Sequence, residues 1–318
     1  THERAPLYGL LCLTYTPGLR DTGFMAKYVP DVKPQRWVVI APARTSRPDD
    51  SGAAHPVVLP RQQAALAKEC PFCPGNEAAT PPEVYRVGPG EKDKPGWFVR
   101  VVPNLFPITD THEVFIHSTS HTDNVDTLPV EQLARIFTAY RDRFRAHQND
   151  GQVIIFCNHG YHAGASLAHP HSQLVVVPKQ INLDSLSREP ITNVVETNDH
   201  FIMYCPDFSQ WPYETWIAPK GDGGMFSDIG DSELPDLASV LSRSLKRISA
   251  MFASSPIRPK DRLGDPLAYN YYISHTDNWF IRIIPRFIHR AGFELGTGLN
   301  VNIIDPTEAA KELQNVKL

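Results

Sequence analysis

The side chains best suited to chemistry gather in one short segment near the middle of the chain. Residues 158–173 read NHGYHAGASLAHPHSQ and hold four of the 13 histidines. An apolar run rich in branched residues precedes the segment at 152–157, and a second follows it at 174–178. Runs of this kind are typical of strands. We therefore expect a loop of small residues that leaves one strand and returns into another.

The end of this loop should present two histidines together. Residues two apart on an extended strand face the same side, and Pro170 restricts His169 to an extended backbone. His169 and His171 should therefore share one face, with Gln173 further along it.

A histidine in this setting could carry out nucleophilic catalysis on phosphorus. Neutral imidazole is nucleophilic near pH 7, and the small residues of 163–166 (AGAS) should offer backbone N–H groups to an anion. A histidine beside such a cradle can attack phosphorus and carry a nucleotidyl group. The alternative is that the two histidines only belong to a polar loop.

A second reactive group is the motif Cys70-Pro-Phe-Cys73. A C-x-x-C knuckle can place two thiolates on one metal ion, with sulfur–zinc distances of about 2.3 Å. A redox dithiol is the rival interpretation, but it would need a strand–helix–strand context, and the following PGNE predicts a loop. The motif therefore favours a zinc site, which requires two further ligands.

Polar residues at two strand ends are candidates for phosphate or nucleoside contacts. Arg44 and Arg47 follow the strand-like run 36–40, and guanidinium groups suit bidentate contact with phosphate. Asn104 ends the run 98–104, ahead of a loop that contains proline. On spacing alone, two solvated surface arginines are as well supported, and an asparagine in a turn is better supported.

Composition places the chain among ordinary globular proteins. Its 318 residues are 42% hydrophobic and 21% charged, enough to bury one large core or two moderate ones. The net charge of −4 predicts no general attraction to nucleic acid or membranes, and no apolar run approaches the roughly 18 residues of a membrane span. Five cysteines with one close pair do not resemble a secreted disulfide framework, so we expect a cytoplasmic protein.

Residues 1–24 show no signal-peptide pattern and are interpreted as an extension.

The order of these patterns repeats in the second half of the chain. The run 98–104 (FVRVVPN) resembles 201–207 (FIMYCPD), and the apolar stripe of a predicted helix at 130–147 recurs at 233–252. Further strand-like pairs follow in unchanged order. We therefore predict two copies of a strand–strand–helix–strand–strand unit.

The two copies differ where chemistry is expected. Aligning Pro178 with Pro285 places Asn278 opposite His171. The second copy therefore lacks the nucleophile, and only the first should be catalytic.

The run HPHSQ (169–173) resembles the HPH-Q active-site motif of the galactose-1-phosphate uridylyltransferase branch of the histidine-triad superfamily. That branch includes ADP-glucose phosphorylases and is related to diadenosine tetraphosphate phosphorylases. The resemblance extends from about Val32 to near the C-terminus. It implies an α+β fold with two tandem histidine-triad-like halves, built from mostly antiparallel sheets with flanking helices. The boundaries would be an extension at 1–24, a catalytic half with a zinc-knuckle arm at 25–190, and a degenerate half at 191–318.

The resemblance also implies roles for individual residues. His171 would be the nucleophile, the backbone carbonyl of His169 would accept its other imidazole N–H, and Gln173 would donate to a phosphoryl oxygen. A structural zinc ion would be held by Cys70, Cys73, His121 and His169. Substrate contacts would come from a set spread over both halves: Arg44, Arg47, Asn104, Asn158, Gly164, Ser166 and Thr297, the last in a glycine-flanked loop before a strand expected at 299–304.

The chain departs from the family pattern in its second half. Relatives often read H-W-H near the last long strand, where this chain has Asn278, Trp279 and Phe280. Arg282 stands where an acidic residue is common. A second metal site is therefore not expected there, and the sugar specificity is left open.

The resemblance implies a nucleotidyltransferase that acts on a nucleoside diphosphate sugar through a nucleotidyl-histidine intermediate. A UDP-glucose:hexose-1-phosphate uridylyltransferase is the leading expectation, with sugar 1-phosphate as acceptor and a homodimer as the assembly. An ADP-glucose phosphorylase, with phosphate as acceptor, is the alternative. A non-catalytic nucleotide-sugar binder is a further one, and a nucleotide hydrolase is the weakest.

Overall fold

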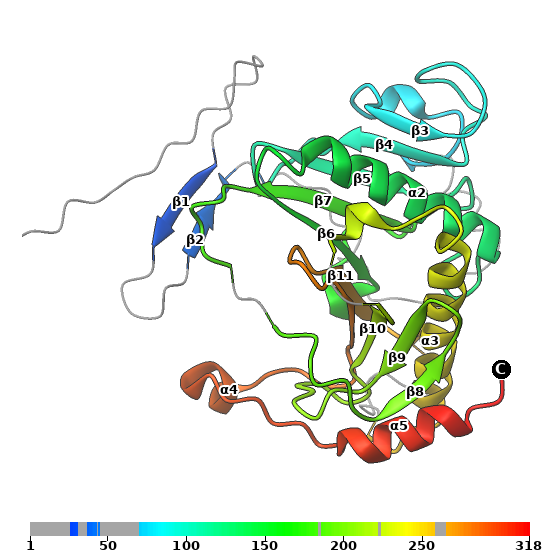
Figure 1. The fold of residues 1–318 in the computed structure, drawn as a ribbon. Helices are drawn as coiled ribbons and strands as arrows, with labels where there is room; N and C mark the ends of the chain where they lie inside the picture. Colours follow the sequence, from blue (N-terminus) through cyan, green and yellow to red (C-terminus); the bar gives the residue numbers. More distant parts are fainter. Residues whose placement is uncertain are drawn as a thin grey trace, which may run out of the picture.

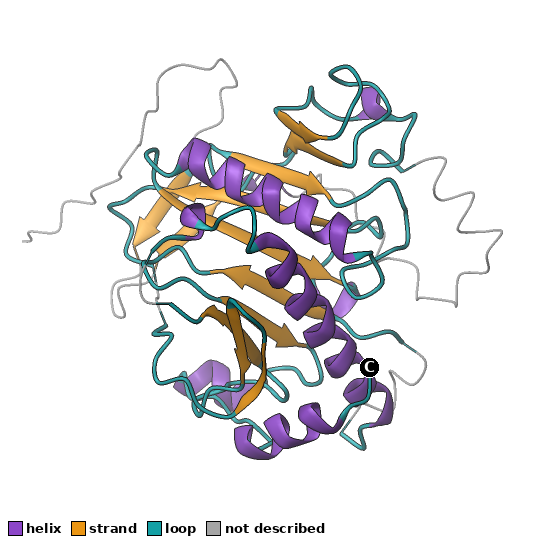
Figure 2. Cartoon of the chain, turned by 45° about the vertical axis from the view of Figure 1, so that its right-hand side comes forward, coloured by secondary structure: helices purple, strands orange, loops and turns teal. Residues whose placement is uncertain are grey.

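The structure is a computed structural model in which a long sheet carries two long helices across one of its faces (Figures 1 and 2). The predicted N-terminal extension and Arg47 lie outside the described residues. Among the described residues, no helix is both long and apolar enough to cross a bilayer. The structure describes residues 26–30, 37–42, 44, 70–183, 186–221, 224–257 and 265–318.

Within the described residues, the strands form one sheet of ten strands and a separate hairpin of two. They are β1 (Lys27–Pro30), β2 (Trp37–Ile40), β3 (Tyr85–Val87), β4 (Val99–Pro103), β5 (His112–Ile116), β6 (Gln152–His159), β7 (His171–Val177), β8 (Val194–Thr197), β9 (Phe201–Tyr204), β10 (Thr215–Pro219), β11 (Tyr269–Ile273) and β12 (Ile281–Pro285).

The helices connect these strands or follow them at the C-terminus (Figure 1). They are α2 (Val130–His147), α3 (Leu234–Ser254), α4 (Gly292–Thr297) and α5 (Pro306–Asn315), with short 3-10 turns η3 (Glu77–Ala79), η4 (Tyr161–Ala163) and η5 (Phe226–Asp228).

The strand order of the large sheet is symmetric about its centre. The order is β3-β4-β5-β7-β6-β11-β12-β10-β9-β8, and all neighbours are antiparallel. The series β4, β5, α2, β6, β7 occupies one half, and β9, β10, α3, β11, β12 occupies the other in the same sequence order. The predicted α+β fold with two tandem, mostly antiparallel halves is confirmed.

The two halves join through a continuous hydrogen-bonded ladder. β6 pairs with β11 from His159↔Tyr269 to Ile155↔Ile273. Because directly paired residues point to the same side of a sheet, each half continues the faces of the other. One face lies under the helices, and the other is the face on which Asn158 and Asn270 pair.

Both long helices form because their apolar residues recur at helical spacing and bury one side. In α2 the stripe predicted from the sequence is buried at Leu133, Ile136, Phe137, Tyr140 and Phe144. In α3 the corresponding stripe is buried at Leu237, Val240, Leu241, Leu245 and Ile248. These residues belong to one core cluster that spans both halves.

The strand expected at 299–304 is absent, and this expectation was wrong. Residues 292–297 form α4, and Gly298 follows it with a φ of 74°. The backbone N–H groups of Leu299 and Ile304 bond to nearby side chains, Thr297 Oγ1 and Asn302 Oδ1. Local side-chain acceptors thus replace a strand partner, and the apolar alternation of this segment does not reach a sheet edge.

A buried network of hydrogen bonds connects the two halves on the helix-covered face of the sheet. The Tyr140 hydroxyl of α2 donates to Ser172 Oγ at 2.6 Å and lies 2.8 Å from the Tyr271 hydroxyl of β11. It also lies 3.1 Å from His117 Nε2. Tyr140 and Ser172 are fully buried and Tyr271 nearly so, so each polar atom depends on its protein partners.

We expect Tyr140→Phe to cost more stability than Tyr271→Phe. The first change leaves Ser172 Oγ and His117 Nε2 without this partner, whereas the second leaves Tyr140 with its other two contacts. Each orphaned buried polar atom costs roughly 1–3 kcal/mol. Urea unfolding should therefore give a loss of about 3 kcal/mol for Tyr140→Phe and about 1 kcal/mol for Tyr271→Phe. Equal losses would show that Tyr140 is not the centre of the network.

Candidate active site

His171 begins β7, and its ring contacts the backbone of the residue two positions before it. His171 Nδ1 lies 2.8 Å from the backbone oxygen of His169. A carbonyl only accepts, so Nδ1 carries a proton, and in the neutral ring Nε2 has the lone pair. The side chain is 9% exposed, and it lines a cavity of about 220 Å³.

The cavity lies at the entrance to β7, between the end of β6 and the loop that joins the two strands. Its lining includes Asn158, Gly160, Tyr161, Ser166 and His171. Gly160 has a φ of 81° and an added Cβ would lie 3.0 Å from Ala268 Cβ. Glycine is therefore required at that turn.

The loop uses more of its backbone donors than the sequence predicts. The N–H groups of Ala163 and Ala165 donate to the Gly160 carbonyl, and that of Gly164 donates to the Tyr161 carbonyl. The expectation that AGAS leaves its N–H groups open to an anion was wrong for these three residues, because η4 winds the loop onto itself. Gly164, with a φ of 79°, does not line the cavity, whereas Ser166 does.

Asn158 is oriented by an asparagine of the second half. Its Oδ1 accepts from Asn270 Nδ2 at 2.7 Å, and Asn270 in turn accepts from Arg286 Nε. The amide oxygen of Asn158 therefore accepts a hydrogen bond from Asn270, and its N–H₂ group can donate to a ligand in the cavity.

Gln173 is oriented in the same manner by two neighbours. Its Oε1 lies 2.8 Å from His112 Nε2 and accepts from Asn104 Nδ2 at 3.3 Å. His112 Nδ1 accepts from the Ile108 backbone N–H at 2.9 Å, so the His112 proton is on Nε2 and is donated to Gln173. The Gln173 amide N–H₂ is therefore directed away from this pair.

The His112 imidazole is neutral in this position. Burial lowers the pKa of His112 to about 4, and the nearby Arg44 guanidinium adds to the effect. Arg44 itself donates from Nη1 to the Phe106 carbonyl at 2.8 Å. The structure thus brings Arg44, Asn104 and Gln173 into one group around His112.

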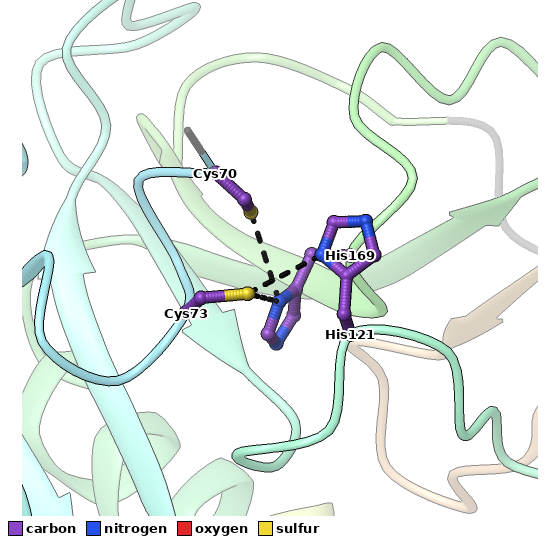
Figure 3. Close-up of side chains that lie close together, drawn as sticks. All are labelled: Cys70, Cys73, His121 and His169. Carbon is purple, nitrogen blue, oxygen red and sulfur yellow. Dashed lines mark hydrogen bonds between the residues drawn. The ribbon is translucent and has the colours of Figure 1, made fainter. Parts of the chain in front are cut away.

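The four predicted metal ligands converge in a second cluster beside the cavity (Figure 3). The potential ligand atoms of Cys70, Cys73, His121 and His169 all lie within 4.8 Å of one another. Cys73 Sγ lies 3.3 Å from His121 Nδ1 and 3.5 Å from His169 Nδ1. Two thiols and two imidazoles at such spacing fit the edges of a tetrahedral site, so this cluster could bind a metal ion.

His169 is shared between the cluster and the cavity. Its Nδ1 faces the cysteines, and its Nε2 lies 3.0 Å from the Ser118 carbonyl. The N–H therefore resides on Nε2, which leaves Nδ1 as the ligand atom. Phe72, inside the C-x-x-C knuckle, packs edge-on against the His171 ring at 5.4 Å between centroids, so the knuckle supports both histidines.

Thr297 does not join this group. It ends α4, where its Oγ1 donates to the Phe293 carbonyl at 2.7 Å. The side chain is exposed and does not line the cavity. Within one chain the structure therefore does not bring Thr297 to the candidate site.

The sequence analysis missed His112, His117 and Asn270. His112 and His117 lie among three histidines at 112–121, and only the third was assigned a role. His117 lines the cavity and its Nδ1 has no partner among the described residues. Asn270 lies more than a hundred residues from Asn158, and only the pairing of β6 with β11 brings them together.

Comparisons with known proteins agree with this geometry. The family model for the N-terminal domain of galactose-1-phosphate uridyl transferase matches residues 107–178. ADP-glucose phosphorylase of Arabidopsis thaliana is 29% identical over 89% of this chain and 91% of its own length. Galactose-1-phosphate uridylyltransferase of Thermotoga maritima is 24% identical over 89% of this chain and 96% of its own.

A solved structure shares the whole architecture. The crystal structure of an ADP-glucose phosphorylase from Arabidopsis thaliana with bound ADP-glucose superposes with a TM-score of 0.66 at 26% identity. The match covers 92% of this chain and 100% of that one. With its tandem halves and its histidine-bearing strand, the chain is similar in sequence and fold to members of the galactose-1-phosphate uridylyltransferase family.

Proposed function

We propose that this protein transfers a nucleotidyl group from a nucleoside diphosphate sugar through a covalent intermediate on His171. The observation that carries the proposal is the 2.8 Å contact between His171 Nδ1 and the His169 carbonyl. In the neutral ring it fixes the tautomer that leaves Nε2 unprotonated, and this ring lines the cavity. An unprotonated imidazole at a phosphate site is a nucleophile near pH 7.

The reaction has two displacements at one phosphorus atom. In the first, His171 Nε2 forms a bond to the α-phosphorus, the bond from that phosphorus to the bridging oxygen breaks, and sugar 1-phosphate leaves with the electron pair. In the second, an oxygen of the acceptor phosphate attacks the same phosphorus, and the nitrogen–phosphorus bond breaks. His171 is restored, and the kinetics are ping-pong.

Two side-chain amides would stabilise the charge that develops on the phosphoryl oxygens. Gln173 and Asn158 each have the amide oxygen engaged by a neighbouring donor, which directs their N–H₂ groups toward other partners. Donors fixed in advance stabilise developing charge without reorganisation. Ser166 and Arg44 would add contacts to the phosphates, as the sequence analysis predicts, while Gly164 would shape the loop.

Two nucleotide specificities are carried forward. A UDP-glucose:hexose-1-phosphate uridylyltransferase agrees with the similarity to the Thermotoga maritima enzyme. An ADP-glucose phosphorylase is favoured by the higher identity to the Arabidopsis thaliana enzyme and by the match to its structure. Both use the same chemistry at His171 and differ in the base and in the acceptor, which is a sugar 1-phosphate or free phosphate.

We further infer that the Cys/His cluster holds a structural zinc ion. Two thiolates and two imidazoles are a donor set that zinc prefers in closed, four-coordinate sites. The ion would fix His169, whose carbonyl in turn holds His171. Zinc would thus act on the position of the nucleophile and would take no part in the phosphoryl step.

A homodimer, a cytoplasmic location and a boundary near residue 190 between the halves complete the proposal. Support for a dimer comes from a row of exposed apolar side chains after β12: Phe293, Leu295, Leu299, Val301 and Ile303. Several exposed apolar side chains along one segment favour an interaction site. The expected role of Thr297 in a partner's sugar site would depend on this assembly.

Incubation with radiolabelled UDP-glucose or ADP-glucose should leave label on the protein, and His171→Asn should reduce it to background. Asparagine cannot act as the phosphorus nucleophile, although its size is similar. His275→Asn, a histidine that does not line the cavity, is the control and should label normally.

The same assay separates the remaining alternatives. Galactose 1-phosphate should release the label from a uridylyltransferase, and inorganic phosphate should release it from a phosphorylase. Nucleotide-sugar binding without label or turnover would indicate a non-catalytic binder and would overturn the proposal.

Acid should destabilise the protein partly through His112. The folded protein keeps His112 neutral down to its lowered pKa of about 4, whereas the unfolded chain gains a proton near pH 6.5. Stability present at neutral pH is therefore lost as the pH falls through this window. Between pH 7 and pH 5 the contribution of His112 to the free energy of unfolding should fall by about 2 kcal/mol, since one pKa unit corresponds to about 1.4 kcal/mol. Urea unfolding of His112→Gln should show a pH dependence that is shallower by this amount.

His147 provides a control because its effect on the pH dependence of stability should have the opposite sign to that of His112. Burial opposes its charge, but hydrogen bonds to Glu113 and Asp150 raise the pKa of His147. The stability that His147 contributes is fully present below the pKa of this residue in the unfolded chain. It is lost as the pH rises through the raised pKa of the folded protein. His147→Gln should therefore make the decline between pH 7 and pH 5 steeper. A His112→Gln variant with the slope of the unchanged protein would contradict the assignment of a neutral, buried His112.

Purified protein should contain about one zinc ion per chain, and Cys73→Ala should lose most of it. The variant should also unfold at a lower temperature, because metal binding contributes to folding free energy. Metal analysis and thermal unfolding measure the two effects. Cys205→Ala, at another buried cysteine, should keep its zinc. Equal zinc in all three proteins would show that the cluster is not the metal site.

A further inference from the structure

A second polar cavity lies in the second half of the sheet and has no role in the reaction described above. Its volume is about 470 Å³, and its lining is rich in cationic side chains. The lining residues are Gln210, Trp211, Arg282, Ile284, Arg286, His289 and Arg290.

This cavity lies on the same face of the sheet as His171. The printed pairs between β6 and β7 end at Phe156↔Gln173. Continuing this antiparallel register by two residues places Asn158 opposite His171. Asn158 pairs with Asn270, and Asn270 pairs with Ile284. One row therefore crosses four strands from His171 to Ile284, with all its side chains on one face.

Two contacts connect the cavities along this face. Arg286 Nε donates to Asn270 Oδ1, and Asn270 donates to Asn158 Oδ1. His162, in the loop that borders the first cavity, lies with its ring centroid 5.7 Å from that of His289. The two cavities are thus neighbours that share a hydrogen-bond chain.

The cationic side chains of the second cavity differ in their partners. Glu214 neutralises Arg282 through contacts of 2.6 and 3.0 Å. Arg290 donates to the neutral Gln210 amide and stacks on Trp211 at 4.8 Å from the ring centroid. Within the described part of the chain, no carboxylate lies within ion-pair distance of Arg290.

Arg286 stacks on the same indole, 4.7 Å from its centroid. Burial and the positive charges of Arg290 and Arg282 lower the pKa of Arg286. Two guanidinium groups held beside one ring repel each other, and a bound anion would relieve that repulsion.

The distance between the cavities limits what the anion can be. Adjacent strands lie about 4.8 Å apart, so three spacings separate Ile284 from His171 by about 14 Å. The phosphate that reacts must contact the phosphorus on His171 and therefore cannot also sit in the second cavity. A hexose ring attached to that phosphate extends across much of the gap, and a substituent on its far carbon would reach the arginines.

We propose that Arg286, His289 and Arg290 bind a second anionic group, a phosphate or a carboxylate, carried on the sugar of the substrate. The sugar-side substrate would then be a hexose 1-phosphate that bears a further phosphate ester or a uronic acid. This inference rests on the proposed function for the placement of the first phosphate, but the anion site itself can be tested without turnover.

The direct test is calorimetric titration of the full chain with glucose 6-phosphate, glucuronate, inorganic phosphate and glucose. Glucose 6-phosphate or glucuronate should bind, and the tighter of the two identifies the anionic group. Glucose should not bind. Arg290→Gln should weaken the binding by about tenfold or more, as expected for the loss of a charge-assisted contact.

Arg135→Gln is the matched control. Arg135 also stacks on an aromatic ring, at 4.1 Å from the Phe98 centroid, but it lies on α2 outside both cavities. It should leave the affinities unchanged. Equal affinities of Arg290→Gln and the unchanged protein would overturn the site, and inorganic phosphate binding as tightly as the sugar anions would overturn its assignment to the sugar.

A kinetic comparison connects the site to the reaction. Release of label from His171 should be at least about tenfold more efficient, in kcat/KM, with glucose 1,6-bisphosphate or glucuronic acid 1-phosphate than with glucose 1-phosphate. Arg290→Gln should remove this preference while labelling of His171 stays normal. Failure of labelling would contradict the proposed function alone, whereas failure of anion binding would contradict the second site alone.

Discussion

The arrangement of the candidate active site depends on one hydrogen bond, from His171 Nδ1 to the backbone oxygen of His169. That bond decides which nitrogen of His171 is a lone-pair donor, so the chemistry depends on where a backbone carbonyl is held. Pro170 keeps the two residues extended. The Cys/His cluster and the Ser118 carbonyl fix the His169 ring from its two nitrogens. The C-x-x-C knuckle and the strand that carries His171 are therefore connected through His169. In the proposed reaction the knuckle would act on the position of His171 without touching the substrate.

The duplication has a structural consequence beyond the second copy's lack of a nucleophile. Because β6 pairs with β11 at the centre of a continuous sheet, the second half supplies Asn270 to the first half's cavity and Tyr271 to the network beneath it. A half that lacks the reactive histidine thus still orients the amide of Asn158. The same continuity places Ile284 at the far end of the row that begins at His171, and Arg286 contacts that row through Asn270.

The sequence predicted the features that arise from local pattern or from a motif, and it failed where distant segments meet. The helix at 130–147 was predicted with its observed bounds, because a stripe at 3.6-residue spacing is a local signal. The HPHSQ strand and the C-x-x-C knuckle are also local, and family resemblance added His121 to the metal set. His112 and Asn270 left no such signal, since their importance comes from contacts across strands. The strand expected at 299–304 failed for a related reason: alternation shows that a segment can be a strand, but not that an edge is available for it.

The departures of the second half from the family pattern have a common physical result. Arg282 would leave a buried cation if it stood alone, and the structure pairs it with Glu214, which is itself fully buried. Glu214 is thus paired with Arg282, and in the described chain Arg290 has no acidic neighbour within ion-pair distance. The charge at position 282 therefore affects the charge balance of the cavity that Arg282 lines. Electrostatics of this kind act on binding and specificity more than on the fold, so the second cavity can differ in what it binds while the paired strands around His171 keep their arrangement.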